Sequence, residues 1–301
     1  MSDNRYTIID LGSNSFHMLT VEKSNNGFSI YAKSKQKVRL AAGLNEQQIL
    51  DQATIQKGLD CLTHFKNELD LLRPKKMLIT ATAALRLAKN KQVFITQAEE
   101  ILQQPINLIS GLEEAATIYK GVAFTENITQ PLLVIDIGGA STELIIGERN
   151  GIYLAHSLNI GCVTWSKRYF PENRLDEKNF MCAIEAAKNV IKPYADEYLN
   201  QGWSVAMGAS GTIQAIQEIN TKQALSPDIN LALLYQLKTL CVDCKTVENL
   251  CINGLKSSRK PVFASGLSIL IALFEMLEIE SMQRSKGALR EGLVSILLAD
   301  S

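Results

Sequence analysis

One short pattern occurs twice in the chain, and this repetition limits the possible folds more than any other feature of the sequence. The stretches IIDLGSNSFHMLTV and VIDIGGASTELIIG both run from an apolar segment through an aspartate, an apolar residue, glycine and small polar residues to a second apolar segment. Their aspartates, Asp10 and Asp136, are 126 residues apart. Each copy predicts two strands joined by a tight turn, so we expect two similarly built lobes.

The segments after each copy predict an α/β fold. Apolar strand-like runs alternate with amphipathic stretches, among them a helix expected over 45–72, a helix over 93–103 and a helix beginning near Gly111. The pattern restarts near residue 130, and a length of 301 residues suits two domains. We therefore expect lobes at 1–126 and 127–301 around a central cleft, with the last helix free to pack back on the first lobe.

Composition excludes several classes of protein. The 31 basic and 31 acidic residues balance, which argues against a nucleic-acid-coating protein. The N-terminus shows no signal peptide, and the longest apolar stretch, VFASGLSILIALFEML, is too short to span a bilayer. We expect a cytoplasmic protein without disulfides, in which Cys241 and Cys244 serve in the core more readily than in a metal or redox site.

The repeated turns have the chemistry of a phosphate grip. Glycine lets backbone N–H groups point outward, and Asp10 and Asp136 offer oxygen ligands to a hard cation such as Mg²⁺. Hydroxyl donors accompany both turns: Ser13, Ser15, Ser141 and Thr142. A third turn, Gly208-Ala209-Ser210-Gly211, precedes a helix and offers either an anion site or a plain strand–helix connection.

Two further features each allow a structural and a functional interpretation. Lys33, Lys35, Lys37 and Arg39 alternate, so a strand would place them on one face, as a solvated surface or as a cationic wall beside a polyanion site. Glu113 follows Ser110 by three residues, which predicts a helix capping box. The same carboxylate at a helix start could orient and deprotonate an attacking water.

The sequence as a whole resembles the exopolyphosphatase/guanosine pentaphosphate phosphohydrolase family. Eight motifs carry the resemblance from about Tyr6 to Leu297, and they occur in the order IDLGSNSFHML, KVRLAAGLN, ATAALRLA, ISGLEEA, DIGGASTEL, IGCVTW, GASGTIQA and GALREGL. Three of them look more like the guanosine pentaphosphate branch. The resemblance implies the two-lobed actin-like ATPase (ribonuclease H-like) fold, removal of the terminal phosphate of pppGpp to give ppGpp, and polyphosphate as a second substrate.

The resemblance also assigns roles to residues. It implies that Glu113 is the water-activating glutamate, that Asp136 and Glu143 are acidic residues associated with Mg²⁺, and that Arg86 contacts phosphate. The phosphate-loop positions fall on Ser13, Asn14, Gly138, Gly139, Ser141, Gly208 and Gly211. We add Asp10, Ser15, Thr142 and Ser210 from the turns themselves, and we place the metal chemistry on the second turn because His17 stands where that copy has Glu143.

The sequence departs from the family at Leu112 and Ala264, where many members have an acid and a proline. Many longer members continue with a helical region, whereas this chain stops at Ser301, either as a short member or as a truncated one. That difference bears on long-polymer binding and on the homodimer that the family would predict. Two other functions of the same fold are a nucleotide-sensing clamp without catalysis and a small-molecule kinase.

Overall fold

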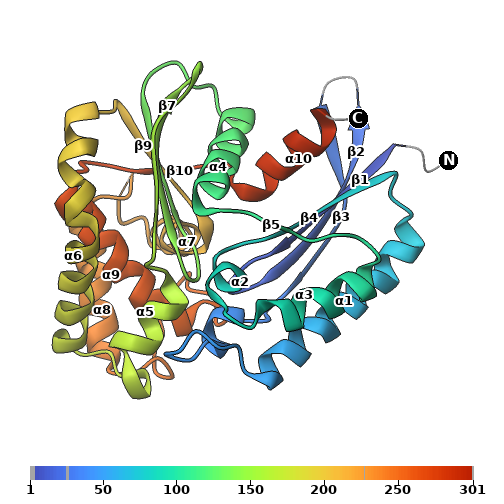
Figure 1. The fold of residues 1–301 in the computed structure, drawn as a ribbon. Helices are drawn as coiled ribbons and strands as arrows, with labels where there is room; N and C mark the ends of the chain where they lie inside the picture. Colours follow the sequence, from blue (N-terminus) through green and yellow to red (C-terminus); the bar gives the residue numbers. More distant parts are fainter. Residues whose placement is uncertain (1–3, 25–26, 227, 300–301) are drawn as a thin grey trace. The chain divides into compact units, whose positions relative to one another are not determined.

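The computed structural model describes residues 4–24, 27–226 and 228–299, which form two compact α/β units. The first unit combines the described residues up to Phe124 with those from Leu289 onward, and the second unit is Thr125–Ala288. Each unit is built on a single five-stranded sheet (Figure 1). The last helix of the chain therefore belongs to the same unit as the first strand.

The first unit has the sheet order β3-β2-β1-β4-β5. β1, β2 and β3 form an antiparallel meander, and β4 and β5 continue the sheet parallel to β1. Its elements are β1 (Arg5–Leu11), β2 (Phe16–Ser24), β3 (Gly27–Gln36), α1 (Gln52–Leu72), β4 (Lys76–Ala81), α2 (Ala83–Leu87), α3 (Lys91–Leu102), β5 (Asn107–Leu108), α4 (Gly111–Thr125) and α10 (Leu289–Ala299).

The second unit has the sheet order β10-β9-β6-β7-β8. β6, β7 and β8 are again an antiparallel meander, with β9 parallel to β6 and β10 parallel to β9. Its elements are β6 (Leu132–Ile137), β7 (Thr142–Glu148), β8 (Gly151–Leu158), α5 (Cys162–Tyr169), α6 (Glu177–Gln201), β9 (Val205–Ala209), α7 (Ser210–Gln223), α8 (Leu231–Cys244), α9 (Lys260–Met276) and β10 (Gln283–Arg284).

The two sheets have one topology. In each, the first strand of the unit lies at the centre, the second and third strands follow on one side, and the fourth and fifth on the other. This is the sheet of the ribonuclease H-like lobes in the actin-like ATPase fold, so the predicted fold class is confirmed. The sequence repeat at Asp10 and Asp136 marks the same point, the end of the central strand, in both units.

Both faces of the first sheet are covered by helices, with α1 and α3 on one side and α10 on the other (Figure 1). The Phe16 ring of β2 meets the Phe94 ring of α3 with centroids 6.1 Å apart. On the opposite face α10 closes a buried apolar cluster with β1 and β2: Tyr6, Ile8, Leu19, Val21, Leu293, Val294 and Leu297. Because side chains of a strand alternate between faces, Asp10 lies on the α10 side of β1.

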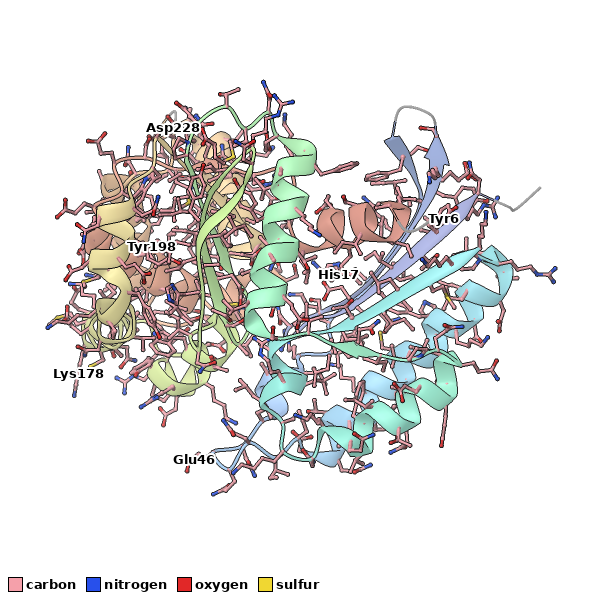
Figure 2. The ribbon with its side chains drawn as sticks, turned by 45° about the horizontal axis from the view of Figure 1, so that its top comes forward. Tyr6, His17, Glu46, Lys178, Tyr198 and Asp228 are labelled. Carbon is pink, nitrogen blue, oxygen red and sulfur yellow. The ribbon has the colours of Figure 1, made fainter. Side chains whose placement is uncertain are left out.

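The core of the second unit centres on α9, the apolar stretch that the sequence analysis predicted to be a buried helix. Its residues from Phe263 to Phe274 are all buried. Tyr198 of α6, labelled in Figure 2, donates its hydroxyl hydrogen to the Leu144 carbonyl of β7 at 2.8 Å. In α8, Cys241 is buried and Cys244 is half-buried. Burial raises the pKa of the Cys241 thiol, which suits a core residue.

Two absences hold for the described part of the chain. None of its helices is long and apolar enough to cross a membrane. Across the same residues, no group of three or more His, Cys, Asp or Glu side chains is arranged to hold a metal ion.

The helix expected over 45–72 begins later than predicted. α1 starts only after Asp51, whose carboxylate accepts a hydrogen bond from the Thr54 backbone N–H at 2.7 Å. This N-cap satisfies one of the first free N–H groups of the helix, and the capping residue itself has extended backbone. The preceding residues pair instead as a small bridge between Leu44 and Leu50.

The predicted row of four basic residues on one strand face is half correct. Lys33 and Lys35 lie in β3, but the strand ends at Gln36, so Lys37 and Arg39 are outside it. Arg39 adopts a left-handed conformation, with φ of 62°, and leads the chain into a short 3₁₀ helix over Leu40–Gly43. Alternation in the sequence continued past the point where the strand stops.

We expect α10 to be an integral part of the first unit's core. Leu293→Ala should lower the free energy of unfolding by about 2–5 kcal/mol, because Leu293 is 3 % exposed and the deletion leaves a cavity. Leu71→Ala is the matched control: Leu71 is 84 % exposed, so its change should stay within about 0.5 kcal/mol. Denaturant unfolding of the two variants measures the difference, and equal small effects would contradict the packing of α10.

Candidate functional site

The two sequence repeats form the same turn at the carboxyl end of the central strand of each sheet. An ideal Cβ on Gly12 would lie 2.9 Å from the Ser15 carbonyl oxygen, and one on Gly138 would lie 3.0 Å from the Ser141 carbonyl oxygen. The Gly138 N–H donates to that Ser141 oxygen at 2.9 Å. Glycine is needed here because the backbone folds back within contact distance. The predicted strand–turn–strand unit is confirmed in both copies.

The first turn is anchored by its neighbours in the first unit. The Ser13 hydroxyl oxygen accepts a hydrogen bond from the Ala84 N–H at the start of α2, at 3.0 Å. The carbonyl oxygens of Ser13 and Asn14 accept from the Ala41 and Arg39 N–H groups, at 2.9 and 3.0 Å. The turn is therefore fixed in place from two directions, as a preorganised anion-binding loop requires.

The second turn is held by the start of α5. The Gly138 carbonyl accepts from the Cys162 N–H at 2.9 Å, one of the free donors of that helix's first turn. Gly161, just before α5, packs so closely on this loop that an added Cβ would lie 2.3 Å from the Ala140 backbone nitrogen and 2.4 Å from the Gly139 carbonyl carbon. The motif IGCVTW thus packs against the backbone of the second turn and holds it in place.

Two predicted phosphate donors use their hydroxyl hydrogens within their own unit. Thr142 is fully buried and donates to the Ile160 carbonyl at 2.7 Å, and Ser210 donates to the Ile137 carbonyl at 2.8 Å. Both bonds tie the loops at the carboxyl edge of the second sheet to one another. These hydroxyls brace the site, and the backbone N–H groups around them remain the candidate anion donors.

An acidic residue of each central strand faces a partner on the next strand. Asp136 pairs in register with Glu143, and Asp10 pairs in register with His17. Directly opposed residues of an antiparallel pair share one face of the sheet, so the two carboxylates of the second unit are neighbours. Asp136 is 8 % and Glu143 1 % exposed, and the Glu143 Oε1 accepts from the Ser157 hydroxyl at 2.8 Å.

The Asp10 carboxyl group is in a buried position that disfavours its charged form. Its Oδ1 is buried and, within the described residues, has no hydrogen-bond partner. Burial raises the pKa of Asp10 to about 7; Arg290 and Lys35 oppose the shift, while Glu114 and Glu291 add to it. An oxygen left in this state is suited to a cation or to a proton-donating ligand. In the second unit, Asp136 and Glu143, which neighbour each other, are suited to a hard divalent cation.

Glu113 forms the predicted capping box at the start of α4. Its Oε2 accepts from the Ser110 N–H at 2.7 Å, and the Ser110 hydroxyl oxygen accepts from the Glu113 N–H at 3.2 Å. The side chain is exposed, and the hydrogen bond from the Ser110 backbone lowers the pKa of Glu113. The capping role is confirmed, and the carboxylate is held ionised in a defined place.

Arg86 has a partner that the sequence analysis missed. Its Nη1 donates to the Glu114 carboxylate at 3.0 Å and to the Ile109 carbonyl at 3.1 Å. Glu114 is buried, which raises its pKa, and the Arg86 charge opposes that rise. The pair Glu113–Glu114 at a helix start was the available signal, since successive helix residues point in different directions and here one is exposed and the other buried.

The third glycine turn contains a second missed residue. Gly211, the second residue of α7, lies directly against the Arg259 side chain, because an added Cβ would lie 1.8 Å from the Arg259 Nη1. Ser210 has a left-handed backbone with φ of 76°, which is uncommon for a residue with a side chain. A guanidinium at a helix N-terminus strengthens the anion-site interpretation of this turn. No local sequence signal links Arg259 to a turn nearly fifty residues earlier.

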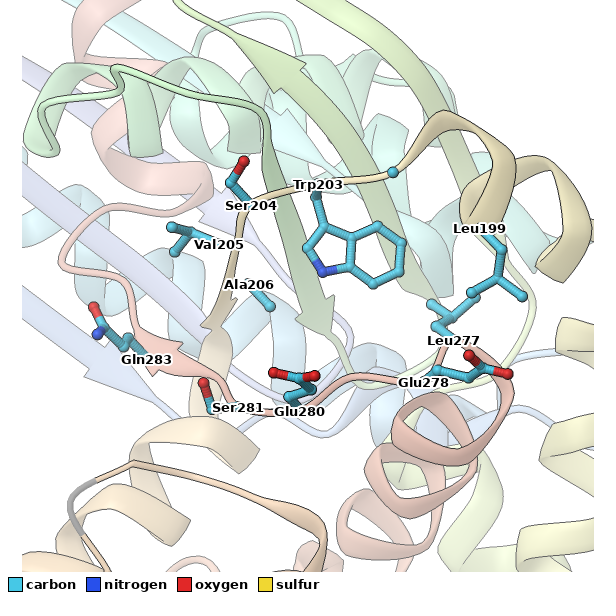
Figure 3. Close-up of a pocket in the computed structure, with 11 residues that line it drawn as sticks. Leu199, Trp203, Ser204, Val205, Ala206, Leu277, Glu278, Glu280, Ser281 and Gln283 are labelled. Carbon is cyan, nitrogen blue, oxygen red and sulfur yellow. The ribbon is translucent and has the colours of Figure 1, made fainter.

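A separate pocket of about 470 Å³ lies in the second unit, away from these turns (Figure 3). It is lined by Trp203, Leu277, Glu278 and Glu280, among others, and by the amino end of β9 at Val205. The third turn leaves the carboxyl end of β9, so the pocket is at the opposite edge of the sheet. It contains none of the predicted site residues.

The geometry can be compared with known proteins. Residues 19–300 match the model of the Ppx/GppA phosphatase family. The chain belongs to that family. It is 50 % identical over 297 residues to the guanosine-5′-triphosphate,3′-diphosphate pyrophosphatase of Pseudoalteromonas translucida, and 50 % identical over 289 residues to the protein of the same name from Vibrio parahaemolyticus. The matches cover 99 % and 96 % of this chain but only 60 % and 58 % of those relatives.

Solved structures of Ppx/GppA proteins share the fold. An exopolyphosphatase from Cytophaga hutchinsonii superposes with a TM-score of 0.88 at 24 % identity, covering 98 % of both chains. The Aquifex aeolicus member of the Ppx/GppA family gives a TM-score of 0.79 at 22 % identity, covering 99 % of both chains. The chain spans about three-fifths of the length of the curated relatives it matches, whereas it matches these two structures over nearly their whole length.

We expect Asp10→Asn to stabilise the metal-free protein at pH 8. A carboxyl whose pKa is raised by folding binds its proton more tightly in the native state, so stability falls as the pH rises from about 4 to about 7. Asparagine removes that cost, which should raise the free energy of unfolding by about 2–4 kcal/mol at pH 8. Denaturant unfolding at pH 8 and pH 4 measures it. The difference should vanish at pH 4, and an equal gain at both pH values would contradict the assignment.

Proposed function

We propose that this chain hydrolyses the terminal phosphoanhydride bond of guanosine 5′-triphosphate 3′-diphosphate (pppGpp), which gives ppGpp and orthophosphate. The observation that carries the proposal is the duplicated glycine turn with a buried aspartate at the end of each central strand. Relatives named for this substrate, at 50 % identity, indicate the ligand. The exopolyphosphatase with the same fold supports polyphosphate as a second substrate.

Backbone donors and guanidinium groups would hold the phosphates. In the first unit, the candidate phosphate donors are the Gly12–Ser15 turn and Arg86. In the second unit, they are the Gly138–Ser141 turn and the Gly208–Gly211 turn with Arg259. Both turns of the sequence repeat are fixed by bonds to neighbouring elements, so little reorganisation is needed when an anion binds. Arg259 extends the residues implied by the family resemblance, on the strength of its contact with Gly211.

The acidic pair of the second unit is the candidate metal site. Asp136 and Glu143 are adjacent, nearly buried and on one face, which suits Mg²⁺ or another hard divalent cation. Such an ion, when bound, neutralises charge on the phosphate oxygens. Two carboxylates are a normal protein contribution to Mg²⁺, whose remaining ligands are water and substrate oxygens.

Glu113 would orient the attacking water. The water oxygen bonds to the terminal phosphorus as the bond from that phosphorus to the bridging oxygen breaks, and the bridging oxygen leaves with the electron pair on ppGpp. One water proton passes to Glu113 and then to solvent, and the other stays on the released orthophosphate. A pKa lowered by the Ser110 hydrogen bond makes Glu113 a modest base, which is adequate because phosphoryl transfer has a loose transition state that depends mainly on positioning.

The substrate proposal can be tested directly against its rivals. We expect orthophosphate release from pppGpp in the presence of Mg²⁺, at a higher rate than from polyphosphate or ATP, and none after EDTA treatment. Tight pppGpp binding without phosphate release would favour the nucleotide-sensing clamp. Phosphate transfer that requires an added acceptor would favour the kinase. We also propose a cytoplasmic location and a homodimer, both of which are expectations from the sequence.

Glu113→Gln should lower kcat by about 10²–10⁴ with little change in stability. Glutamine keeps an acceptor oxygen for the Ser110 N–H, so the capping box survives while the basic group is lost. Glu100→Gln on the exposed surface of α3 is the matched control and should be silent. Steady-state kinetics and thermal unfolding on the same preparations separate the two roles, and a Glu113→Gln protein with unchanged kcat would remove Glu113 from the mechanism.

A further inference from the structure

The segment GALREGL leads into the last helix, and the proposed reaction leaves it without a role. α10 begins at Leu289, so Arg290 lies in its first turn. The Arg290 Nη1 is 3.3 Å from the His17 Nδ1 of β2, across 273 residues of sequence. This contact joins the end of the chain to its first turn, and Figure 2 labels His17 among the strands of the first unit.

His17 lies at the base of the Gly12–Ser15 turn. β1 ends at Leu11 and β2 begins at Phe16, which pair with each other, and the next pair inward is Asp10 with His17. Both members of that pair face α10, on the same side as the apolar cluster of Ile8 and Leu19. Arg290 therefore touches the sheet one residue pair away from the candidate phosphate loop.

The contact fixes the chemistry of the imidazole. A guanidinium has N–H donors and no acceptor, so the His17 Nδ1 must be the acceptor of this hydrogen bond. An Nδ1 that accepts carries no proton, which leaves the proton on Nε2. His17 is thus held as the neutral Nε2–H tautomer, with its ring orientation set by the bond to Arg290.

The charges around the pair give Arg290 a second effect. Burial disfavours the Asp10 carboxylate, and among neighbouring charges the Arg290 guanidinium opposes that penalty most, followed by Lys35, which pairs with His17 in the sheet register. Glu114 and Glu291 act in the opposite direction. Arg290 consequently supports both residues at the base of the turn.

Helix packing fixes the position of Arg290. Gly292 lies against α4, where an added Cβ would be 1.9 Å from the Thr117 carbonyl oxygen. Thr117 itself donates its hydroxyl hydrogen to the Glu113 carbonyl at 2.7 Å. The next two residues of α10, Leu293 and Val294, are part of the buried apolar cluster. Arg290, Glu291 and Gly292 therefore link the candidate phosphate loop to α4, the helix that carries Glu113. Arg290 contacts His17 at the base of the loop, and Gly292 packs on the α4 backbone.

We propose that Arg290 is a positioning residue, which holds the base of the Gly12–Ser15 turn by orienting His17 and offsetting the charge of Asp10. Its catalytic consequence rests on the proposed phosphohydrolase function, whereas its effect on His17 does not. Because the turn grips phosphate both before and during transfer, loss of the support should raise KM more than it lowers kcat.

Nitrogen-15 NMR of the histidine side chains tests the structural half. The chain has three histidines, so His64→Gln and His156→Gln variants assign the His17 signals. At pH 8 the parent should show His17 with a protonated Nε2 and an unprotonated, hydrogen-bonded Nδ1. Arg290→Met should shift the Nδ1 signal and mix the tautomers, while His156, which contacts Tyr198, stays unchanged.

Kinetics on the same variants test the functional half. Arg290→Met should lower kcat/KM for phosphate release by about 10- to 100-fold, which is the worth of a charge-assisted hydrogen bond, mainly through KM. Arg290→Lys keeps the charge and should recover part of the loss. Arg5→Met is the matched control, because Arg5 binds Glu22 at the far end of β1 and should change neither His17 nor KM.

The outcomes are distinguishable. Unchanged His17 signals in Arg290→Met overturn the proposal, whatever the activity. Shifted signals with an unchanged KM and kcat restrict Arg290 to a structural contact and overturn the positioning role. A parent protein that releases no phosphate contradicts the proposed function, and the NMR result then still decides the contact. If Arg290→Met fails to fold, Arg290→Lys still tests the contact: its ammonium keeps the charge but places the donor differently, so the His17 Nδ1 signal should shift while KM changes less.

Discussion

The residues around each glycine turn are constrained by the buried aspartate at the carboxyl end of the central strand. A carboxylate taken out of water is costly unless charges or donors replace the lost hydration. The fold puts one in each unit, Asp10 and Asp136, where the chain must also turn sharply on a glycine. The neighbouring residues are best understood as the means by which each carboxylate is tolerated and kept available for a ligand.

The two units meet this demand differently. Around Asp10 the penalty of burial is opposed by two cations, Arg290 from α10 and Lys35 from β3, while Glu114 and Glu291 add to it, and His17 is in the paired position. Asp136 instead has a second carboxylate, Glu143, in the paired position, with the Ser157 hydroxyl bound to it. Two adjacent acids suit a divalent cation, whereas the Asp10 carboxyl has charges of both signs around it. The duplicated fold thus surrounds the two aspartates with different charges.

The predictable parts of this protein are the local ones. The turns at Gly12 and Gly138, the capping box of Ser110 and Glu113 and the buried helix α9 all follow from residues within a few positions of one another. The alternation of lysines predicted the β3 face only as far as the strand continues, because the strand ends at Gln36 and the left-handed Arg39 then leads the chain into a 3₁₀ helix. Sequence periodicity does not show where a strand stops when the following residues keep the same pattern.

The parts that the sequence did not reveal are long-range. Arg290 with His17, Arg259 with Gly211 and Arg86 with Glu114 are contacts that only the folded topology creates. In each case a guanidinium reaches the start of a strand or helix in another segment. The motif GALREGL was visible as a pattern, but its meaning depends on α10 crossing back to the first sheet. The motif alone did not predict which side chain Arg290 would contact.

The state of Glu113 constrains the chemistry that the family fold can support here. A strong general base would need a raised pKa, which burial or a neighbouring acid could provide. Neither effect raises the pKa of Glu113, because its side chain is exposed and the Ser110 hydrogen bond stabilises its ionised form. Its capping bond instead fixes the carboxylate in space, at the start of a helix whose own position depends on the contact of Gly292 with Thr117. This arrangement favours aligning a water over abstracting its proton early, which matches a reaction whose transition state has little bond formation to the nucleophile. The capping bond and the proposed water-orienting role of Glu113 therefore require the same property, a carboxylate that is ionised and held by a hydrogen bond.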